Sequence, residues 1–214
     1  MDELLNAKTI APVSAESFET FIAAMEHFSP LSGPLKTKLR AVLHETTYQK
    51  GRYILNAGAK QKLLWFNLDG LLREISVDRH TFDARTSWYW FDASFVYASP
   101  GFFDQQPAQI SIEVIKDAKV LLLTFEQWKS LKSNLPEAEA LIEKIRTQQE
   151  TRRKDHLREI HELSTAARYR IHQRQINQLL PAVKLRYIAE YLGMSTDTLG
   201  KLRRKFIRYR QPVD

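Results

Sequence analysis

The chain of 214 residues contains no cysteine. This absence excludes disulfide bonds, a thiolate zinc site, a cysteine-ligated iron–sulfur cluster and a cysteine nucleophile. The N-terminal segment MDELLNAKTIAPVSAESF lacks the basic region and the apolar core of a signal peptide, and a run of about 18 apolar residues occurs nowhere. The sequence therefore predicts a cytoplasmic protein that is not secreted and does not span a membrane.

Catalytic and metal-binding patterns are equally scarce. No nucleophile with a nearby base, no acid and base pair and no phosphate-binding glycine loop stands out. Among the six histidines only His156 and His161 are close in sequence, and residues five apart do not lie squarely on one face of a helix. We therefore predict no enzymatic activity, no catalytic residues, no metal site and no cofactor. A haem sensor built on an isolated histidine is an alternative without positive support.

Charge is distributed unevenly along the chain. Residues 151–214 contain 15 Lys and Arg against 6 Asp and Glu, whereas residues 1–150 contain 17 basic and 19 acidic side chains. Basic charge confined to one end indicates a polyanionic partner such as nucleic acid, whose binding draws free energy from the release of counterions. The alternative is a solvated basic surface without a partner.

The first two thirds of the chain combine helical segments with many strands. Apolar residues at helical spacing predict helices from about residue 14 to 43, interrupted at residues 29–34. From about residue 46 to 124 the chain changes to short runs rich in β-branched and aromatic residues. These runs are RYIL, KLLWFNL, LLREISV, TSWYWF, ISIEVI and KVLLLTF. Several short strands at such spacing predict an antiparallel sandwich or barrel.

A long helix is predicted from Pro136 to about Leu163, because neither glycine nor proline interrupts this stretch. Its apolar stripe begins with Leu141, Ile142 and Ile145, fades, and resumes with Leu157, Ile160 and Leu163. It is too thin for a core element along its whole length, so we predict that the helix, through Leu141, Ile142 and Ile145, meets a second copy of the chain. Two ordinary helices broken near Glu150 are the alternative.

The segment RYIAEYLGMSTDTLGKLRRKF has the pattern of two helices joined by a tight turn. Gly193 stands where a helix ends in a left-handed residue, and Ser195 can cap the next helix. The outward face of that second helix suits insertion into the major groove of DNA. We expect Asp197 to accept from cytosine and Lys201 to donate to guanine, while arginines meet phosphates. The candidate DNA-binding residues are Ser195, Thr196, Asp197, Thr198, Lys201, Arg203, Arg204, Lys205 and Arg208.

Together these segments resemble the Crp/Fnr family of bacterial transcription regulators. The resemblance rests on the helical segment FIAAMEHFSPLSGPLKTKLRAVL, the strand start KGRYILNAGAK, the glycine hairpin LDGLLREI and the long helix. Its most specific part is LRYIAEYLGMSTDTLGKLRRKF, which is similar to the Bacteroidetes-type branch of the family. It implies an α+β fold: an N-terminal antiparallel β-roll (the jelly roll of cyclic-nucleotide-binding domains) with flanking helices, a long dimerisation helix and a C-terminal helical helix-turn-helix domain. We expect a sensor domain at residues 1–135, the dimerisation helix at 136–163 and the DNA-binding domain at 164–214.

The resemblance fails at the phosphate cassette of the cyclic-nucleotide-binding members. In those members a glutamate takes the ribose hydroxyl and an arginine takes the cyclic phosphate. Here Asp92 and Ala93 stand near the glycine–glutamate position, Ala108 stands where the arginine would be, and no basic residue occurs between Thr86 and Ile115. A phosphate loses its bidentate, charge-assisted partner without that arginine, so we predict that cyclic AMP does not bind in the usual way.

An effector other than a cyclic nucleotide would need a pocket of its own. Its candidate residues are Phe91, Ala93, Ala108 and Gln109. A cluster of aromatic residues could line a pocket for an apolar effector or could be ordinary core packing. The cluster consists of Trp88, Tyr89, Trp90, Phe91, Phe95, Tyr97, Phe102 and Phe103.

Eight residues follow Phe206, too few for the β-hairpin wing that many family members carry. Contacts to the DNA backbone would come instead from Arg203, Arg204, Lys205, Arg208 and Arg210. We predict a dimeric regulator that binds double-stranded DNA, with an unknown or lost effector and RNA polymerase as a candidate partner. The alternatives are a β-roll enzyme of the cupin type and a degenerate β-roll that binds a ligand or another protein without sequence-specific DNA binding.

Overall fold

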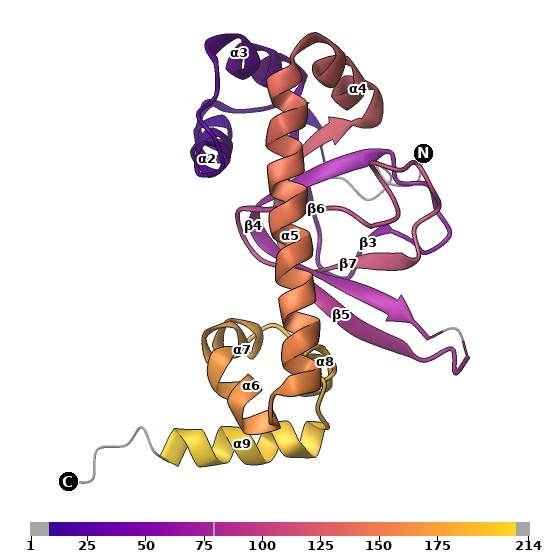
Figure 1. The fold of residues 1–214 in the computed structure, drawn as a ribbon, viewed down its shortest axis with the longest axis vertical. Helices are drawn as coiled ribbons and strands as arrows, with labels where there is room; N and C mark the ends of the chain where they lie inside the picture. The colour runs from indigo at the N-terminus through magenta and orange to yellow at the C-terminus, as the bar shows by residue number, and fades with distance from the viewer. Residues whose placement is uncertain (1–8, 79, 209–214) are drawn as a thin grey trace, which may run out of the picture.

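The computed structural model describes residues 9–78 and 80–208, with side chains up to Phe206. The fold is α+β, as the sequence predicts: an antiparallel sheet flanked by helices, one long helix and a helical C-terminal unit (Figure 1). The strands are β1 (Ala11–Pro12), β2 (His44–Tyr48), β3 (Tyr53–Leu55), β4 (Leu63–Val77), β5 (Ala84–Trp90), β6 (Ser94–Val96) and β7 (Ile110–Thr124).

The sheet is built around the two 15-residue strands β4 and β7, which pair antiparallel along most of their length. The strand order is β1-β2-β7-β4-β5, with β3 paired to β7 and β6 paired to β4. The side chains of β4 are buried at nearly every position, since the strand is covered on both faces. The sequence pattern predicted two short strands in place of each of these long strands, and that part of the prediction was wrong.

The predicted glycine hairpin at LDGLLREI does not form, because β4 continues through Gly70. The pairing register between β4 and β7 shifts on both sides of this glycine, which is the signature of bulges. Gly70 has φ +135°, and a Cβ added there would lie 2.5 Å from the Cα of Ala118 on β7. The glycine therefore permits a close approach of two strands rather than a turn.

Three helices pack at one end of the sheet around the start of the long helix (Figure 1). They are α2 (Ala15–Glu26), α3 (Gly33–Val42) and α4 (Phe125–Asn134). The hydroxyls of Ser14, Ser32 and Thr124 each accept a hydrogen bond from the amide N–H three residues later, so each helix begins at a capped residue. These helices and the adjoining strands enclose the first hydrophobic core of the protein.

The long helix α5 (Pro136–Glu162) is continuous over 27 residues, so the alternative of two helices broken near Glu150 is excluded. Its apolar stripe does not need a second copy of the chain. Leu141, Ile142 and Ile145 are all buried within the first core, against α2, α3, α4 and the sheet. The prediction that these three residues form a dimer contact is therefore wrong, because the chain covers them itself.

The C-terminal unit consists of four short helices beyond the end of α5 (Figure 1). They are α6 (Thr165–Ile171), α7 (Gln173–Leu179), α8 (Leu185–Tyr191) and α9 (Thr196–Arg208). Their apolar side chains form a third core, to which the sheet contributes Leu71, Tyr89 and Ile115. This shared core joins the helical unit to the β4–β5 hairpin.

Candidate nucleic-acid interface

Helices α8 and α9 are joined by a tight turn, in the arrangement that the sequence predicts. Gly193 lies in the turn with φ +60°, a left-handed conformation that favours glycine. The N–H groups of Gly193 and Met194 donate to the carbonyls of Glu190 and Ala189, both at 3.0 Å, and so satisfy the end of α8. The turn is therefore set by local chemistry that can be read in the sequence.

Ser195 caps α9 as predicted. Its hydroxyl accepts a hydrogen bond of 3.1 Å from the amide N–H of Thr198. Asp197 lies in the first turn, where a carboxylate interacts favourably with the positive end of the helix. The start of α9 is thus fixed in position, with short polar side chains at its tip.

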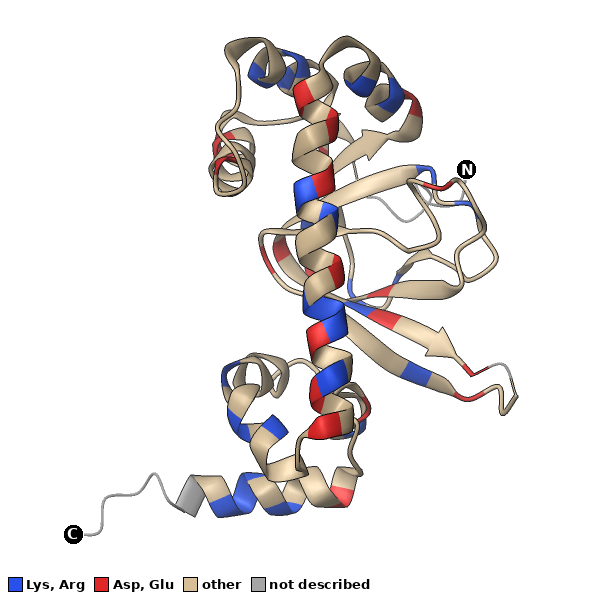
Figure 2. Ribbon diagram, in the orientation of Figure 1, with Lys and Arg blue, Asp and Glu red and all other residues tan. Residues whose placement is uncertain are grey.

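One face of α9 is buried and the opposite face is exposed. Leu199 packs completely into the third core, and Leu202 and Phe206 pack against its edge. The exposed face carries Thr196, Asp197, Lys201, Arg204 and Lys205. Figure 2 shows basic residues along this helix, on the outer side of the helical unit.

The remaining candidate DNA-binding residues lie on or beside this face. Ser195 is exposed, and Thr198 and Arg203 are partly buried. The backbone of Arg208 ends α9, but its side chain and the whole of Arg210 lie outside the described residues. The predicted residues are therefore gathered on one helix, and their contact with DNA stays a prediction.

The two predicted base-reading residues pair with each other. The ammonium of Lys201 lies 2.7 Å from the carboxylate of Asp197, one turn earlier on α9. Both side chains are more than two thirds exposed, with relative exposures of 69% and 68%. An exposed pair of this kind contributes only about 0.3–0.5 kcal/mol, so an incoming base edge can displace it.

Arg168 anchors the turn between α8 and α9 to the end of α5. Its guanidinium is buried and donates to three main-chain carbonyls, those of Ile160 at 2.6 Å, Leu163 at 2.7 Å and Gly193 at 2.9 Å. Ile160 also packs directly on Gly193, where an added Cβ would lie 2.7 Å from its methyl group. One side chain of α6 therefore ties the turn of the motif to the end of the long helix. Sequence reasoning missed this role, since nothing around Arg168 distinguishes it from the surrounding basic residues.

A second junction links the helix-turn-helix to the sheet. The carboxylate of Glu190 on α8 accepts from the amide N–H of Thr86 on β5, at 2.9 Å. The guanidinium of Arg73 on β4 lies 3.8 Å from the ring centre of Tyr187 on α8 and pairs with Glu113 at 2.6 Å. The helical unit is therefore held by both α5 and the β4–β5 hairpin.

The four candidate effector residues do not line one pocket. Phe91 and Ala93 border a cavity of about 400 Å³ between β5, α5 and the helical unit. Ala108 is buried in a second hydrophobic core, formed by strand residues that include Trp65, Leu72 and Trp90. Gln109 is an exposed residue just before β7. The aromatic cluster is likewise divided. Trp88, Tyr89, Trp90 and Phe91 border this cavity, whereas Phe95, Tyr97, Phe102 and Phe103 pack in the first core.

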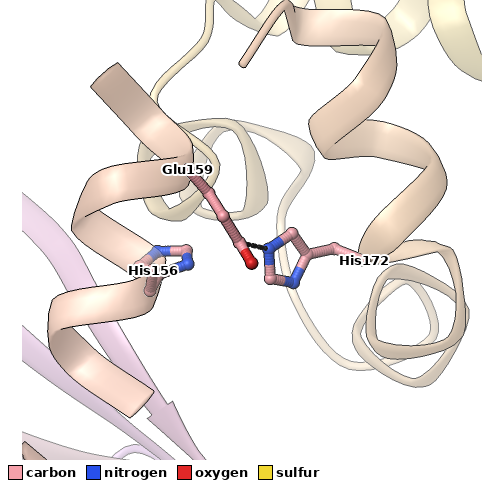
Figure 3. A group of neighbouring side chains, drawn as sticks. All are labelled: His156, Glu159 and His172. Atoms are coloured by element: carbon pink, nitrogen blue, oxygen red, sulfur yellow. Dashed lines mark hydrogen bonds and ion pairs between the residues drawn. The ribbon is translucent and has the colours of Figure 1, made fainter. Parts of the chain in front are cut away.

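The same cavity contains an arrangement that sequence reasoning missed. His156, Glu159 and His172 border it, and one ligand atom of each lies within 4.8 Å of the others (Figure 3). The prediction of no metal site considered the pair His156 and His161, whereas the fold brings His172 to His156. No sequence signal marks this group, because His172 lies on a different helical segment.

No helix in the described ranges is long and apolar enough to cross a membrane. No family model matches the sequence, and no curated protein matches it.

Solved structures show the fold clearly. The chain is similar to FixK2 from Bradyrhizobium japonicum (TM-score 0.66, 16% identity, covering 78% of this chain and 86% of that one). It is similar to a protein assigned to the Crp/Fnr regulator family from Eubacterium rectale (TM-score 0.64, 16% identity, 86% and 88% covered). It is also similar to the c-di-GMP-responsive global regulator CLP from Xanthomonas campestris (TM-score 0.62, 15% identity, 83% and 93% covered). The fold is thus that of Crp/Fnr-type regulators, and the finer likeness to a Bacteroidetes-type branch has no support.

The anchoring role of Arg168 leads to a stability prediction. Arg168→Met should lower the free energy of unfolding by about 3 kcal/mol or more, because three carbonyls lose a charged donor inside the protein. Arg174→Met, at an exposed position of α7, should change it by less than about 0.5 kcal/mol. Urea denaturation followed by circular dichroism measures both values. Equal effects of the two substitutions would contradict the anchoring role.

Proposed function

We propose that the chain is a transcription regulator that binds specific sites on double-stranded DNA through α9. The observation that carries this proposal is the exposed polar and basic face of α9, capped at Ser195 and held beside a tight turn. A helix presented in this way fits the major groove, with its first turn directed toward base edges. The Crp/Fnr-type fold supports the same function.

The electrostatics of the chain support binding to a polyanion. Residues 151–214 have 15 basic and 6 acidic side chains, and basic bands follow α9 along its length (Figure 2). Neutralised phosphates release counterions, so affinity for any duplex should fall steeply as salt rises. A gel shift with random-sequence DNA at two salt concentrations tests this, and an absence of binding at low salt would favour the alternative of a protein-binding module.

We further propose the division into a sensor domain at 1–135, a connecting helix at 136–163 and a DNA-binding domain at 164–214. The second core supports it, because it draws only on residues 48–122, whereas the first core also includes Leu141, Ile142 and Ile145 of the connecting helix. The third core crosses the division, since Leu71, Tyr89 and Ile115 pack with the helical unit. A movement of the β4–β5 hairpin would therefore also displace the helix-turn-helix.

We propose that a homodimer forms through the outward face of the second half of α5. This face is exposed at Thr147, Glu150, Thr151, Lys154, Leu157, Arg158 and His161. Leu157, at 56% exposure, is its one large apolar side chain. In a parallel pair of helices related by a two-fold axis, Leu157 would meet its copy, and Glu150 could pair with Lys154 of the other chain.

The dimer face can be separated from the core face by two matched substitutions. Leu157→Lys should yield monomers that remain folded, because the substitution alters only the exposed face of α5. Ile142→Lys should instead lower the thermal midpoint, because it places a charge in the first core. Light scattering and thermal unfolding measure the two effects. A dimer that survives Leu157→Lys would contradict this placement.

The proposed regulator should not respond to cyclic AMP or cyclic GMP. No arginine lies between Thr86 and Ile115, and two arginines on flanking elements are already engaged. Arg73 pairs with Glu113 at 2.6 Å, and Arg153 pairs with Glu74 at 2.8 Å. We expect isothermal titration calorimetry to detect no binding of either nucleotide at a dissociation constant of about 1 μM or tighter. A tighter constant would overturn this expectation.

Two residues of α9 should have different effects on DNA binding. Lys201→Ala should remove about 1–3 kcal/mol of preference at one base pair of each half-site, because it removes a donor to guanine. Arg204→Ala should weaken binding to all sequences and lower the salt slope by about one. Selection from random duplexes measures the first effect, and anisotropy titrations over a salt series measure the second.

Lys129→Ala is the matched control for these variants, since Lys129 is an exposed cation on α4, far from α9 (Figure 1). It should leave both sequence preference and salt slope unchanged. If the Lys201 variant selects the parental sequence at every position, α9 does not read bases as proposed.

A further inference from the structure

Three potential metal ligands meet where α5 passes the helical unit. His156 and Glu159 lie one turn apart on α5, and His172 lies between α6 and α7. Both histidines are largely buried: His156 is 6% exposed and His172 is 9% exposed. Figure 3 shows the two rings on either side of the Glu159 carboxylate.

The ring of His156 has a nitrogen whose hydrogen bonding is unsatisfied. Its Nε2–H donates to the carbonyl of Tyr191 at 2.9 Å, and the ring stacks on that of Tyr191 at 4.2 Å. The Nδ1 atom is buried and has no hydrogen-bond partner. With Nε2 as the donor, a neutral imidazole carries its lone pair on Nδ1. A histidine that donates one N–H to a carbonyl and keeps the other nitrogen free is arranged as metal-binding histidines are.

His172 has the same kind of arrangement. Its Nδ1 lies 2.6 Å from the side-chain oxygen of Gln175, an acceptor, so Nδ1 is the donor. Its Nε2 lies 2.6 Å from the carboxylate of Glu159. A lone pair and a carboxylate this close need a proton or a cation between them. A proton on Nε2 would satisfy this pair alone, whereas a metal ion would also use the Nδ1 of His156.

We propose that His156, Glu159 and His172 bind a divalent transition-metal ion of the Zn²⁺ class. Two imidazole nitrogens and one carboxylate oxygen suit zinc and similar ions, and three protein ligands leave a position for water or a small ligand. The adjoining cavity of about 400 Å³ gives that position room.

Binding the ion would change the contact between two parts of the protein. The carboxylate of Glu159 on α5 lies 2.6 Å from Nε2 of His172, whereas two ligands of a tetrahedral zinc ion lie about 3.4 Å apart. An ion between these atoms therefore separates them and shifts the α6–α7 segment relative to α5. Since α6 and α7 share the third core with α8 and α9, the ion would alter the position of the helix-turn-helix. This consequence, unlike the metal site itself, rests on the proposed DNA binding.

Metal binding can be measured without DNA. Isothermal titration calorimetry of the full chain with Zn²⁺ should give about one ion per chain. Co²⁺ should give a visible absorption spectrum and should quench the fluorescence of Trp88, because the ring of Trp88 lies 5.6 Å from that of His156. His156→Gln, Glu159→Gln and His172→Gln should each weaken Zn²⁺ binding at least about tenfold. His161→Gln, on the same helix but exposed and outside the group, should leave it unchanged.

Circular dichroism establishes that the variants are folded. Glu159 is a partly exposed residue, so Glu159→Gln carries the test if a histidine variant does not fold. Failure of the wild type to bind Zn²⁺ would overturn the proposal. So would equal affinity of the wild type and Glu159→Gln, or a loss of affinity in His161→Gln as large as that in His156→Gln.

The effect on DNA is measured separately. Anisotropy titrations of a selected duplex, with Zn²⁺ or with a chelator, should differ in affinity at least about fivefold for the wild type and not at all for Glu159→Gln. Zn²⁺ binding without any change in DNA affinity would overturn the coupling. An absence of DNA binding under both conditions would contradict the proposed function but would not affect the conclusion about the metal site.

Discussion

The position of α9 depends on the hydrogen bonds of the buried guanidinium of Arg168. It holds the carbonyls of Ile160 and Leu163 at the end of α5 and the carbonyl of Gly193 in the turn between α8 and α9. Gly193 makes this possible, because any larger residue would collide with Ile160. The direction of α9 is thus set by the end of the long helix, and whatever displaces that end also displaces the proposed DNA-binding face.

The long helix has two different halves. The first half is a core element, with Leu141, Ile142 and Ile145 buried by the chain itself. The outward face of the second half is polar. Its inward face contacts the helical unit through His156 and Ile160. Since β4 and β5 also contribute to the third core, the sheet and α5 hold the helical unit from two sides. A change on either side would therefore move α9 without altering the side chains on its exposed face.

Features that depend only on residues close together in the sequence were predictable. The turn at Gly193, the cap at Ser195 and the buried Leu199 are local, and the structure has them where the pattern predicts. The stripe on α5 showed that a face is buried but not what buries it. Gly70 was misread because a left-handed glycine serves a turn and a close strand approach equally well. The group containing His172 was missed, since only the tertiary fold brings it to α5.

The central claim, that α9 enters the major groove, has a direct test because the chain contains no cysteine. Thr196→Cys introduces one thiol in the first turn of α9, to which an iron chelate that cleaves DNA can be attached. The same label at Glu19→Cys, on the exposed face of α2 at the other end of the molecule, is the control (Figure 1). We predict that the label on α9 cleaves a selected duplex at two places about one helical turn apart, one per half-site, and that the label on α2 does not cleave it. Identical cleavage by both labels, or none by the label on α9, would contradict the account.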